Sequence, residues 1–305
     1  VPTVASMHSL TLSFAREGFE ARLQHSLRLS GAGYIILLFA DGTMSKFVGN
    51  YLFHAAAALG GGRRQHTLLL VCLDGSAFDQ CLLFSRRFGQ LDIACADMQG
   101  WIPQATFEHR GGFGSCLWRV CVWSKAFVTW RLVGMSSRPV MLTDLDVVLR
   151  KDLTQWVSDR RSKTGKDAPP LFAQMEGQVP GALVNTGLLV FDRHHLPLLA
   201  DWAVLSAEAL GDKTPTQDAM NDLLGTTENT TQLRRPSSYP LAQFLGKHRA
   251  IVTVVRFPGK VAGFCGNLGE YTTHYNCLSG DDKMAAMIRN GDWHNVSLPA
   301  LPRVL

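Results

Sequence analysis

The chain has 305 residues, a formal net charge of +5, 46% hydrophobic residues and 18% charged residues, values ordinary for a globular protein with room for one large α/β domain. Lys and Arg are spread along the sequence, without the basic stripe interleaved with aromatics that is typical of nucleic-acid binding. The longest apolar run, 32–40, is too short to cross a bilayer. We therefore expect no nucleic-acid partner and no membrane-spanning segment between Val1 and Leu305.

Strands and helices are predicted to alternate through the first half of the chain, after a mixed helical stretch within residues 1–31. Asp41 and Asp74 directly follow the first two strands. This alternation is typical of a doubly wound parallel sheet, which binds ligands at the carboxyl ends of its strands. The strands are predicted at 34–40, 67–73 and 92–95, and the helices at 46–59, 78–88 and 117–133.

A further apolar strand, 140–142, stops at Thr143 and is followed by Asp144 and Asp146. Apolar residues on both faces, renewed at 147–149, indicate a central strand of a covered sheet. Because side chains two apart on a strand point the same way, both carboxylates should converge on one divalent cation. The alternative is that the two acids cap the strand end or the next turn. We favour the metal site, since unpaired buried carboxylates are unfavourable.

The alternation changes after Asp152. The polar segment 158–170 is predicted to be a surface loop. Two strands, at 171–175 and 183–191, precede a helix at 196–210 and another that begins near Thr216. A long polar loop at 226–240 is a candidate element of an acceptor site.

Seven cysteines show neither CxxC pairs nor zinc-ligand spacing, and their odd number leaves at least one thiol unpaired within the chain. Cys72 lies in a predicted strand and is expected in the core. N-glycosylation sequons at Asn229 and Asn295 fit the secretory pathway, although about one such match is expected by chance.

Four blocks in order carry a resemblance to a known family. They are TDLDVV at 143–148, VNTGLLVF at 184–191, TQDAMN at 216–221, and a terminal set made of FPG at 257–259, HYNCLSGDDK at 274–283 and the pair Asp292-Trp293. From about residue 34 to 293 the chain resembles the nucleotide-diphospho-sugar transferases of glycosyltransferase family 77. That family includes plant and algal arabinosyl- and xylosyltransferases and a protist galactosyltransferase.

The resemblance implies a GT-A-type α/β fold with a doubly wound, mostly parallel central sheet and a Rossmann-like N-terminal half. It also implies a UDP-sugar donor, Mn²⁺ or Mg²⁺, and transfer of a pentose or galactose to a glycan or glycoprotein acceptor with retention of configuration. The implied location is the Golgi or endoplasmic reticulum lumen, with membrane attachment only through a segment upstream of Val1.

The domain organisation expected from these patterns has three parts. Residues 1–31 form a stem-like or helical extension, 32–293 form a single catalytic domain, and 294–305 form a tail. Within the catalytic domain, 32–152 would bind the nucleotide, and 153–293 would bind the sugar and the acceptor.

The resemblance makes His274 the third metal ligand beside Asp144 and Asp146. A metal there would act as a Lewis acid on the leaving diphosphate. Without the resemblance, a lone histidine is more often structural or solvated. Lys283 is implied to contribute a charge to the diphosphate and Gly280 to allow close backbone approach. The alternative for Lys283 is an exposed residue at a helix start.

The resemblance also implies donor-binding roles for Lys125, Asn185 and Thr186. The alternatives are a solvated helix residue for Lys125 and a plain turn for the triplet at 185–187. Gln217 is expected on the sugar face opposite the leaving group. Asp218 would bind sugar hydroxyls or act as a nucleophile.

Asp41 and Asp74 are weaker candidates for uridine contacts, because FADG at 39–42 is only loosely like the first strand end of the family. Two rival functions remain. DLDVV at 144–148 fits the DxDx[TV] motif of haloacid-dehalogenase-type phosphatases, with Asp144 as nucleophile, and 280–282 resembles their late acidic motif. Their nucleophile, however, normally sits on the first strand. The other rival is an inactive, transferase-like sugar-binding protein.

Overall fold

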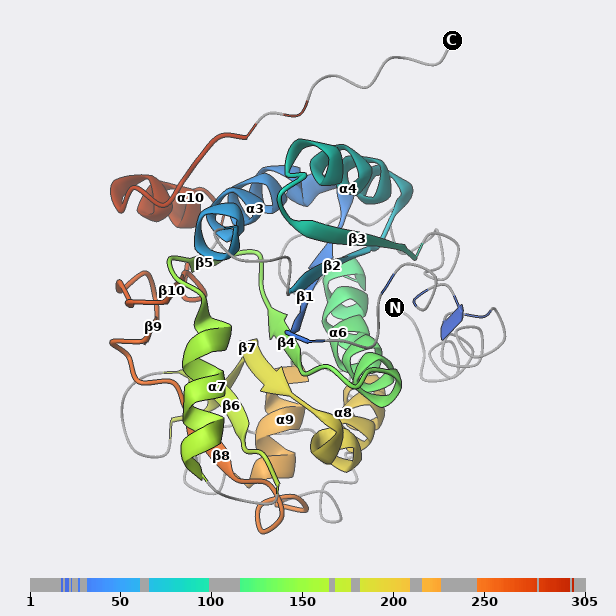
Figure 1. Cartoon of the computed structure of the whole chain (residues 1–305). Coiled ribbons are helices and arrows are strands. Elements are labelled where there is room, and N and C mark those ends of the chain that lie inside the picture. The colour runs from blue at the N-terminus through green and yellow to red at the C-terminus, as the bar shows by residue number, and fades with distance from the viewer. Residues whose placement is uncertain are drawn as a thin grey trace.

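A seven-stranded sheet lies at the centre of the described part of the chain (Figure 1). The computed structural model describes residues 18, 20–21, 23, 27, 32–60, 66–98, 116–164, 168–176, 182–208, 216–225, 246–278, 280–296 and 298. The strands of this sheet are β1 (Ile35–Ala40), β2 (Thr67–Cys72), β3 (Asp92–Asp97), β4 (Val140–Thr143), β6 (Leu171–Met175), β7 (Val184–Phe191) and β8 (Val254–Arg256). Their order is β3-β2-β1-β4-β7-β6-β8.

Six of these seven strands run parallel, and β7 alone is antiparallel to its neighbours β4 and β6. The expected doubly wound, mostly parallel sheet is therefore confirmed. Nearly every residue of β1, β2, β4 and β7 is buried, as strands covered on both faces require.

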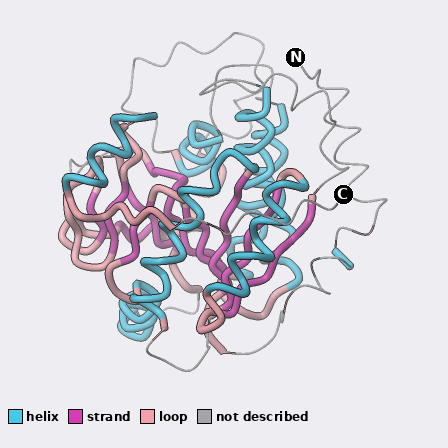
Figure 2. The backbone as a smooth tube through the Cα atoms, turned by 90° about the horizontal axis from the view of Figure 1, so that it is seen from above, coloured by secondary structure: helices cyan, strands magenta, loops and turns pink. Residues whose placement is uncertain are grey.

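Helices cover both faces of the sheet, as Figure 2 shows from above. One face packs against α3 (Ser45–Leu59), α4 (Gly75–Arg87) and α7 (Leu153–Thr164). The other packs against α6 (Cys116–Met135), α8 (Leu196–Glu208) and α9 (Thr216–Leu224). A further helix is α10 (Gly280–Arg289), and two short 3-10 turns are η1 (Gly42–Met44) and η2 (Arg193–His195).

The prediction of a surface loop at 158–170 is wrong for its first half, because α7 continues to Thr164. Leu153 and Val157 are buried on the inner side of this helix, and Trp156 packs edge-on against Phe172 at a centroid distance of 6.1 Å. The other residues of the helix are polar or charged. Because so few of its residues are apolar, its composition resembles that of a loop.

The apolar run 147–149 does not continue the central strand. It forms β5 (Val147–Leu149), which belongs to a second sheet in the order β5-β10-β9 with β9 (Ala262–Gly263) and β10 (Thr272–His274). β10 pairs antiparallel with β5, so that His274 lies opposite Val147. This pairing brings the C-terminal part of the chain to the residues that follow β4.

Asp292 fastens the segment after α10 to the second sheet. Its two carboxylate oxygens each lie 2.6 Å from Nη2 of Arg150, and Tyr275 donates to it at 2.7 Å. Residues beyond it pack on α3, where His294 N donates to Asn50 at 2.7 Å and Val296 is buried. The division into an extension, a catalytic domain and a tail stays a prediction.

Two disulfides lie in the described ranges. Cys81–Cys95 joins α4 to β3, and Cys265–Cys277 closes the loop that contains β10. Cys72 is a buried free cysteine, as expected from its strand. Asn229 and the predicted loop 226–240 lie outside the described residues.

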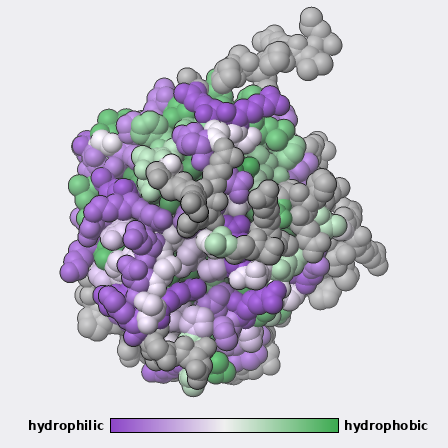
Figure 3. Space-filling model, viewed as in Figure 1, coloured by the Kyte–Doolittle hydropathy of each residue, from purple (hydrophilic) through white to green (hydrophobic). Residues whose placement is uncertain are grey.

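None of the helices in the described part of the chain is both long and apolar enough to cross a bilayer. Figure 3 shows hydrophilic and hydrophobic residues mixed over the face drawn in colour. The large hydrophobic side chains that are exposed come from separate elements; they are Phe53, Leu82, Val204, Ile251, Leu268 and Ile288.

Candidate active site

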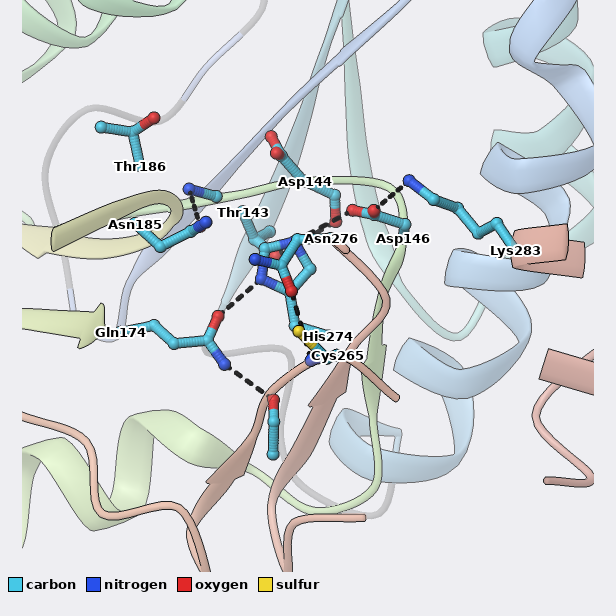
Figure 4. Close-up of polar contacts among 12 residues, drawn as sticks. Thr143, Asp144, Asp146, Gln174, Asn185, Thr186, Cys265, His274, Asn276 and Lys283 are labelled. Carbon is cyan, nitrogen blue, oxygen red and sulfur yellow. Dashed lines mark hydrogen bonds and ion pairs between the residues drawn. The ribbon is translucent and has the colours of Figure 1, made fainter. Parts of the chain in front are cut away.

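Asp144 and Asp146 lie in the turn that joins β4 to β5, at the carboxyl edge of the central sheet (Figure 4). Asp144 N donates to Gly187 O at 2.8 Å, and Tyr275 N donates to Asp146 O at 3.1 Å. The expectation that strand alternation aligns the two carboxylates is therefore wrong. Backbone bonds to β7 and to the residue after β10 hold the turn, and the turn itself makes the carboxylates converge.

The end of β10 places His274 against these carboxylates. One ligand atom each from Asp144, Asp146 and His274 lies within 4.8 Å of the other two. Nε2 of His274 is buried, lies 3.2 Å from Asp146 Oδ1, and has no hydrogen-bond partner among the described residues. Two carboxylates and an imidazole nitrogen are suitable ligands for a divalent cation. The structure thus brings together the three predicted metal ligands, and a cation would satisfy the orphaned nitrogen.

Two lysines compensate the two aspartates. Lys125, from α6, pairs with Asp144, and Lys283, from α10, lies 2.5 Å from Asp146 Oδ2. Burial raises the pKa of Asp146, but His274 and Lys283 more than reverse this and hold that pKa far below its usual range. Burial lowers the pKa of Lys125, but Asp144 outweighs it and the net pKa is raised. Asp146 and Lys125 therefore stay charged near neutral pH. Neither lysine is a freely solvated residue.

The predicted sugar-binding residues lie beside this cluster. Asn185 and Thr186 are inside β7, so the triplet at 185–187 is not the plain turn of the alternative interpretation. Thr186 N donates to Gln217 Oε1 at 3.2 Å. Asp218 lies half-buried in the first turn of α9.

A carboxylate missed by the sequence analysis joins these amides. Glu176 Oε1 accepts from Gln217 Nε2 at 2.6 Å and from Asn185 Nδ2 at 3.3 Å. Gln174, also unassigned from the sequence, is buried and contacts His274. Both belong to β6 and its end. Polar residues in an otherwise apolar strand were the available signal, because such groups need partners when they are buried.

Asp41 and Asp74 lie at the carboxyl ends of β1 and β2, as expected. Asp41 accepts from Thr43 N at 2.7 Å, and Asp74 accepts from Ala77 N at 2.8 Å, so each caps the helix that follows. Contacts of either residue with uridine stay a prediction. Gly280 begins α10 with a φ of +52°, and no atom lies within 4 Å of the position that a Cβ would take.

Gly187 leaves the space in which the metal ligands meet. A Cβ on this residue would lie 2.5 Å from His274 Cε1, 2.8 Å from Asp144 Oδ2 and 2.9 Å from Asn185 Oδ1. All three distances are shorter than van der Waals contact. Only glycine at this position of β7 permits the observed arrangement.

Comparison with known proteins identifies the fold. No protein-family model and no curated sequence matches the chain. Among solved structures, an active-site mutant of the galactosyltransferase LgtC is similar with a TM-score of 0.52 and 13% identity, over 88% of this chain and 98% of that one. The apo form of mouse xyloside xylosyltransferase 1 is similar with a TM-score of 0.50 and 9% identity, over 80% and 98%. The described chain therefore has the GT-A fold of glycosyltransferases.

Replacing Gly187 by Ala should weaken Mn²⁺ binding at least about tenfold, because the added methyl group can be accommodated only by moving a metal ligand. Calorimetric titration with Mn²⁺ measures the change. Gly134→Ala is the matched control, since a Cβ there meets only Leu196 Cδ2 at 3.6 Å. This helix variant should bind Mn²⁺ normally and gain roughly 0.5–1 kcal/mol of stability. Normal Mn²⁺ affinity in a folded Gly187→Ala protein would contradict the steric argument.

Proposed function

We propose that this protein is a metal-dependent glycosyltransferase that moves a pentose or galactose from a UDP-sugar to a glycan or glycoprotein acceptor, with retention of configuration. The observation that carries the proposal is the convergence of Asp144, Asp146 and His274 at the carboxyl edge of a GT-A sheet. Ligands of doubly wound sheets bind at this edge. The donor, the sugar and the stereochemistry follow from the resemblance to family 77.

The charges of the site favour a metal-bound diphosphate. Asp144 and Asp146 carry two negative charges, and Lys125 and Lys283 carry two positive ones, so these four groups sum to zero. A diphosphate alone would gain little net attraction there. A bound Mn²⁺ or Mg²⁺ would add two positive charges and neutralise the leaving diphosphate. Lys125 and Lys283 flank the aspartates, and we propose that each ammonium contacts a phosphate oxygen of the donor.

Gln217 is the proposed catalytic residue on the sugar side. Glu176 holds its amide nitrogen, so its oxygen faces the Thr186 N–H. An amide oxygen is a poor covalent nucleophile but can stabilise positive charge that develops at the anomeric carbon. The LgtC mutant replaces a glutamine of its own active site by glutamate, which supports a role for this residue type. Asp218 would bind sugar hydroxyls or, as the alternative, act as the nucleophile.

The acceptor has a candidate place next to Gln174, the residue that contacts His274. A cavity of about 240 Å³ lies next to Gln174 and is lined in part by Met175, Arg256, Phe257 and Phe264. Apolar and aromatic walls with a few polar groups are typical of small-molecule sites. We assign the acceptor glycan to this cavity.

A location in the Golgi or endoplasmic reticulum lumen belongs to the same proposal. The disulfides Cys81–Cys95 and Cys265–Cys277 support it, since such bonds persist in oxidising compartments. Asn295, in the second sequon, is exposed. Endoglycosidase treatment of the native protein tests the location, and a protein that carries no glycan would count against it.

The phosphatase alternative has less support from the site. Its nucleophile would be Asp144, which follows the fourth strand along the chain and pairs with Lys125. That function also leaves Asn185 and Gln217 without roles. An inactive sugar-binding protein would keep the fold and donor site but not transfer.

UDP should bind only in the presence of a divalent cation, because the lysines are already neutralised by the aspartates. Calorimetry with UDP in EDTA and then in Mn²⁺ measures this. Asp146→Asn should abolish the difference, whereas Asp159→Asn, which alters an exposed carboxylate on α7, should not. Equal UDP affinity with and without metal would contradict the proposed site. Mn²⁺-dependent hydrolysis of one UDP-sugar in a panel would identify the donor.

Gln217→Ala should lower kcat by roughly 10- to 1,000-fold with little change in UDP affinity, at about 1.4 kcal/mol per decade of rate. The lost amide acts on the sugar and not on the nucleotide. Gln155→Ala, which truncates an exposed amide on α7, is the matched control. NMR of the newly formed glycosidic bond should show the anomeric configuration of the donor. An inverted centre would overturn the retaining assignment and make Asp218 the first candidate for a base.

A further inference from the structure

A buried chain of two hydrogen bonds lies behind the third metal ligand (Figure 4). Gln174 Nε2 lies 2.7 Å from Gly263 O, and Gln174 Oε1 lies 2.5 Å from His274 Nδ1. Gln174 and His274 are each only 1% exposed. Because both side chains are buried, their polar groups must make their hydrogen bonds within the protein.

The backbone carbonyl at its far end sets the direction of every bond in this chain. Gly263 O can only accept, so the Gln174 group facing it must be the NH₂. The amide oxygen then faces His274, and it too can only accept. Nδ1 of the imidazole must therefore carry a proton, and Nε2 is the nitrogen that remains to offer a lone pair to a cation.

We propose that Gln174 is a positioning residue that holds His274 as the Nδ1–H tautomer, with the Nε2 lone pair directed at Asp144 and Asp146. This inference deepens the proposed function and rests on it for the identity of the ion. The hydrogen bond between Nδ1 and Gln174 is itself present without a metal. It directs Nε2 toward the carboxylates, 3.2 Å from Asp146 Oδ1.

The opposite tautomer would disable the site. A proton on Nε2 would point at the carboxylates and occupy the position of a cation. Nδ1 and Gln174 Oε1 would then face each other as two acceptors. A partner that orients a metal-bound histidine in this way typically contributes about 10–100-fold to metal affinity.

Gly263, whose carbonyl accepts the last of these hydrogen bonds, is held in place by the second sheet. Gly263 is paired with Thr273 in β9 and β10, next to His274. A Cβ on Gly263 would lie 1.7 Å from Asn267 O, so the backbone around it is closely packed. The acceptor on which the tautomer depends therefore comes from the same sheet that positions the imidazole.

The most direct test is a long-range ¹H–¹⁵N correlation spectrum of the full, metal-free chain with ¹⁵N-labelled histidine. His274→Ala identifies the signal by its loss. We expect a proton on Nδ1, whether or not Nε2, 3.2 Å from Asp146 Oδ1, also carries one. A ring protonated at Nε2 alone would overturn the inference. Because no metal is present, this result stands apart from the proposed function, which a lack of Mn²⁺ affinity would contradict.

Variants connect the tautomer to metal binding. Gln174→Leu removes the acceptor and should give a mixed tautomer and about 10–100-fold weaker Mn²⁺ binding. Gln174→Glu keeps an acceptor oxygen for Nδ1–H but loses the NH₂ that donates to Gly263 O. It should therefore keep the proton on Nδ1 and recover only part of the affinity. The control is Asn50→Leu, which removes an equally buried amide whose oxygen accepts from His294 N. An unchanged tautomer and Mn²⁺ affinity in Gln174→Leu would overturn the inference, and if this variant does not fold, the wild-type spectrum decides.

Discussion

The mutual repulsion of Asp144 and Asp146 is the constraint around which this end of the fold is built. Two carboxylates that meet at a sheet edge are unstable neighbours unless positive charge surrounds them. Helices from both halves of the chain contribute it: Lys125 comes from α6 and Lys283 from α10. His274 completes the cluster with a nitrogen that has no described hydrogen-bond partner. Asp144 and Asp146 are thus balanced by Lys125 and Lys283, and with the orphaned nitrogen of His274 they offer a suitable set of ligands for the proposed cation.

The second sheet makes this arrangement possible because it spans the sequence. β5 directly follows the two aspartates, and β10 lies more than a hundred residues later, yet the two strands are paired. Asp292, bound to Arg150 and Tyr275, closes the same assembly from beyond α10. Cys265–Cys277 constrains the loop that carries β10. These contacts explain why motifs that are far apart in the sequence lie together in the fold.

Local patterns sufficed to predict every strand of the central sheet except β8, and the residues that end the first strands, since periodicity and burial are properties of short segments. They failed where the decisive partner is distant. Residues 158–164 of the charged helix α7 were predicted as part of a loop, because the apolar side of this helix is recognisable only from its packing against Phe172. The run at 147–149 has the composition of a central strand, and only its pairing with β10 places it elsewhere. Glu176 and Gln174 gained roles from Gln217 and His274, contacts that no local pattern encodes.

The family resemblance predicted His274 as a ligand, which spacing alone could not do, and the fold brings it to the aspartates as expected. What these three residues hold is the central question. An anomalous-difference map, recorded at the manganese edge from crystals soaked with Mn²⁺ and UDP, answers it most directly. The predicted result is a single peak bonded to Asp144, Asp146 and His274 Nε2, next to the diphosphate. A diphosphate bound in the site with no such peak would contradict the metal-bridged site.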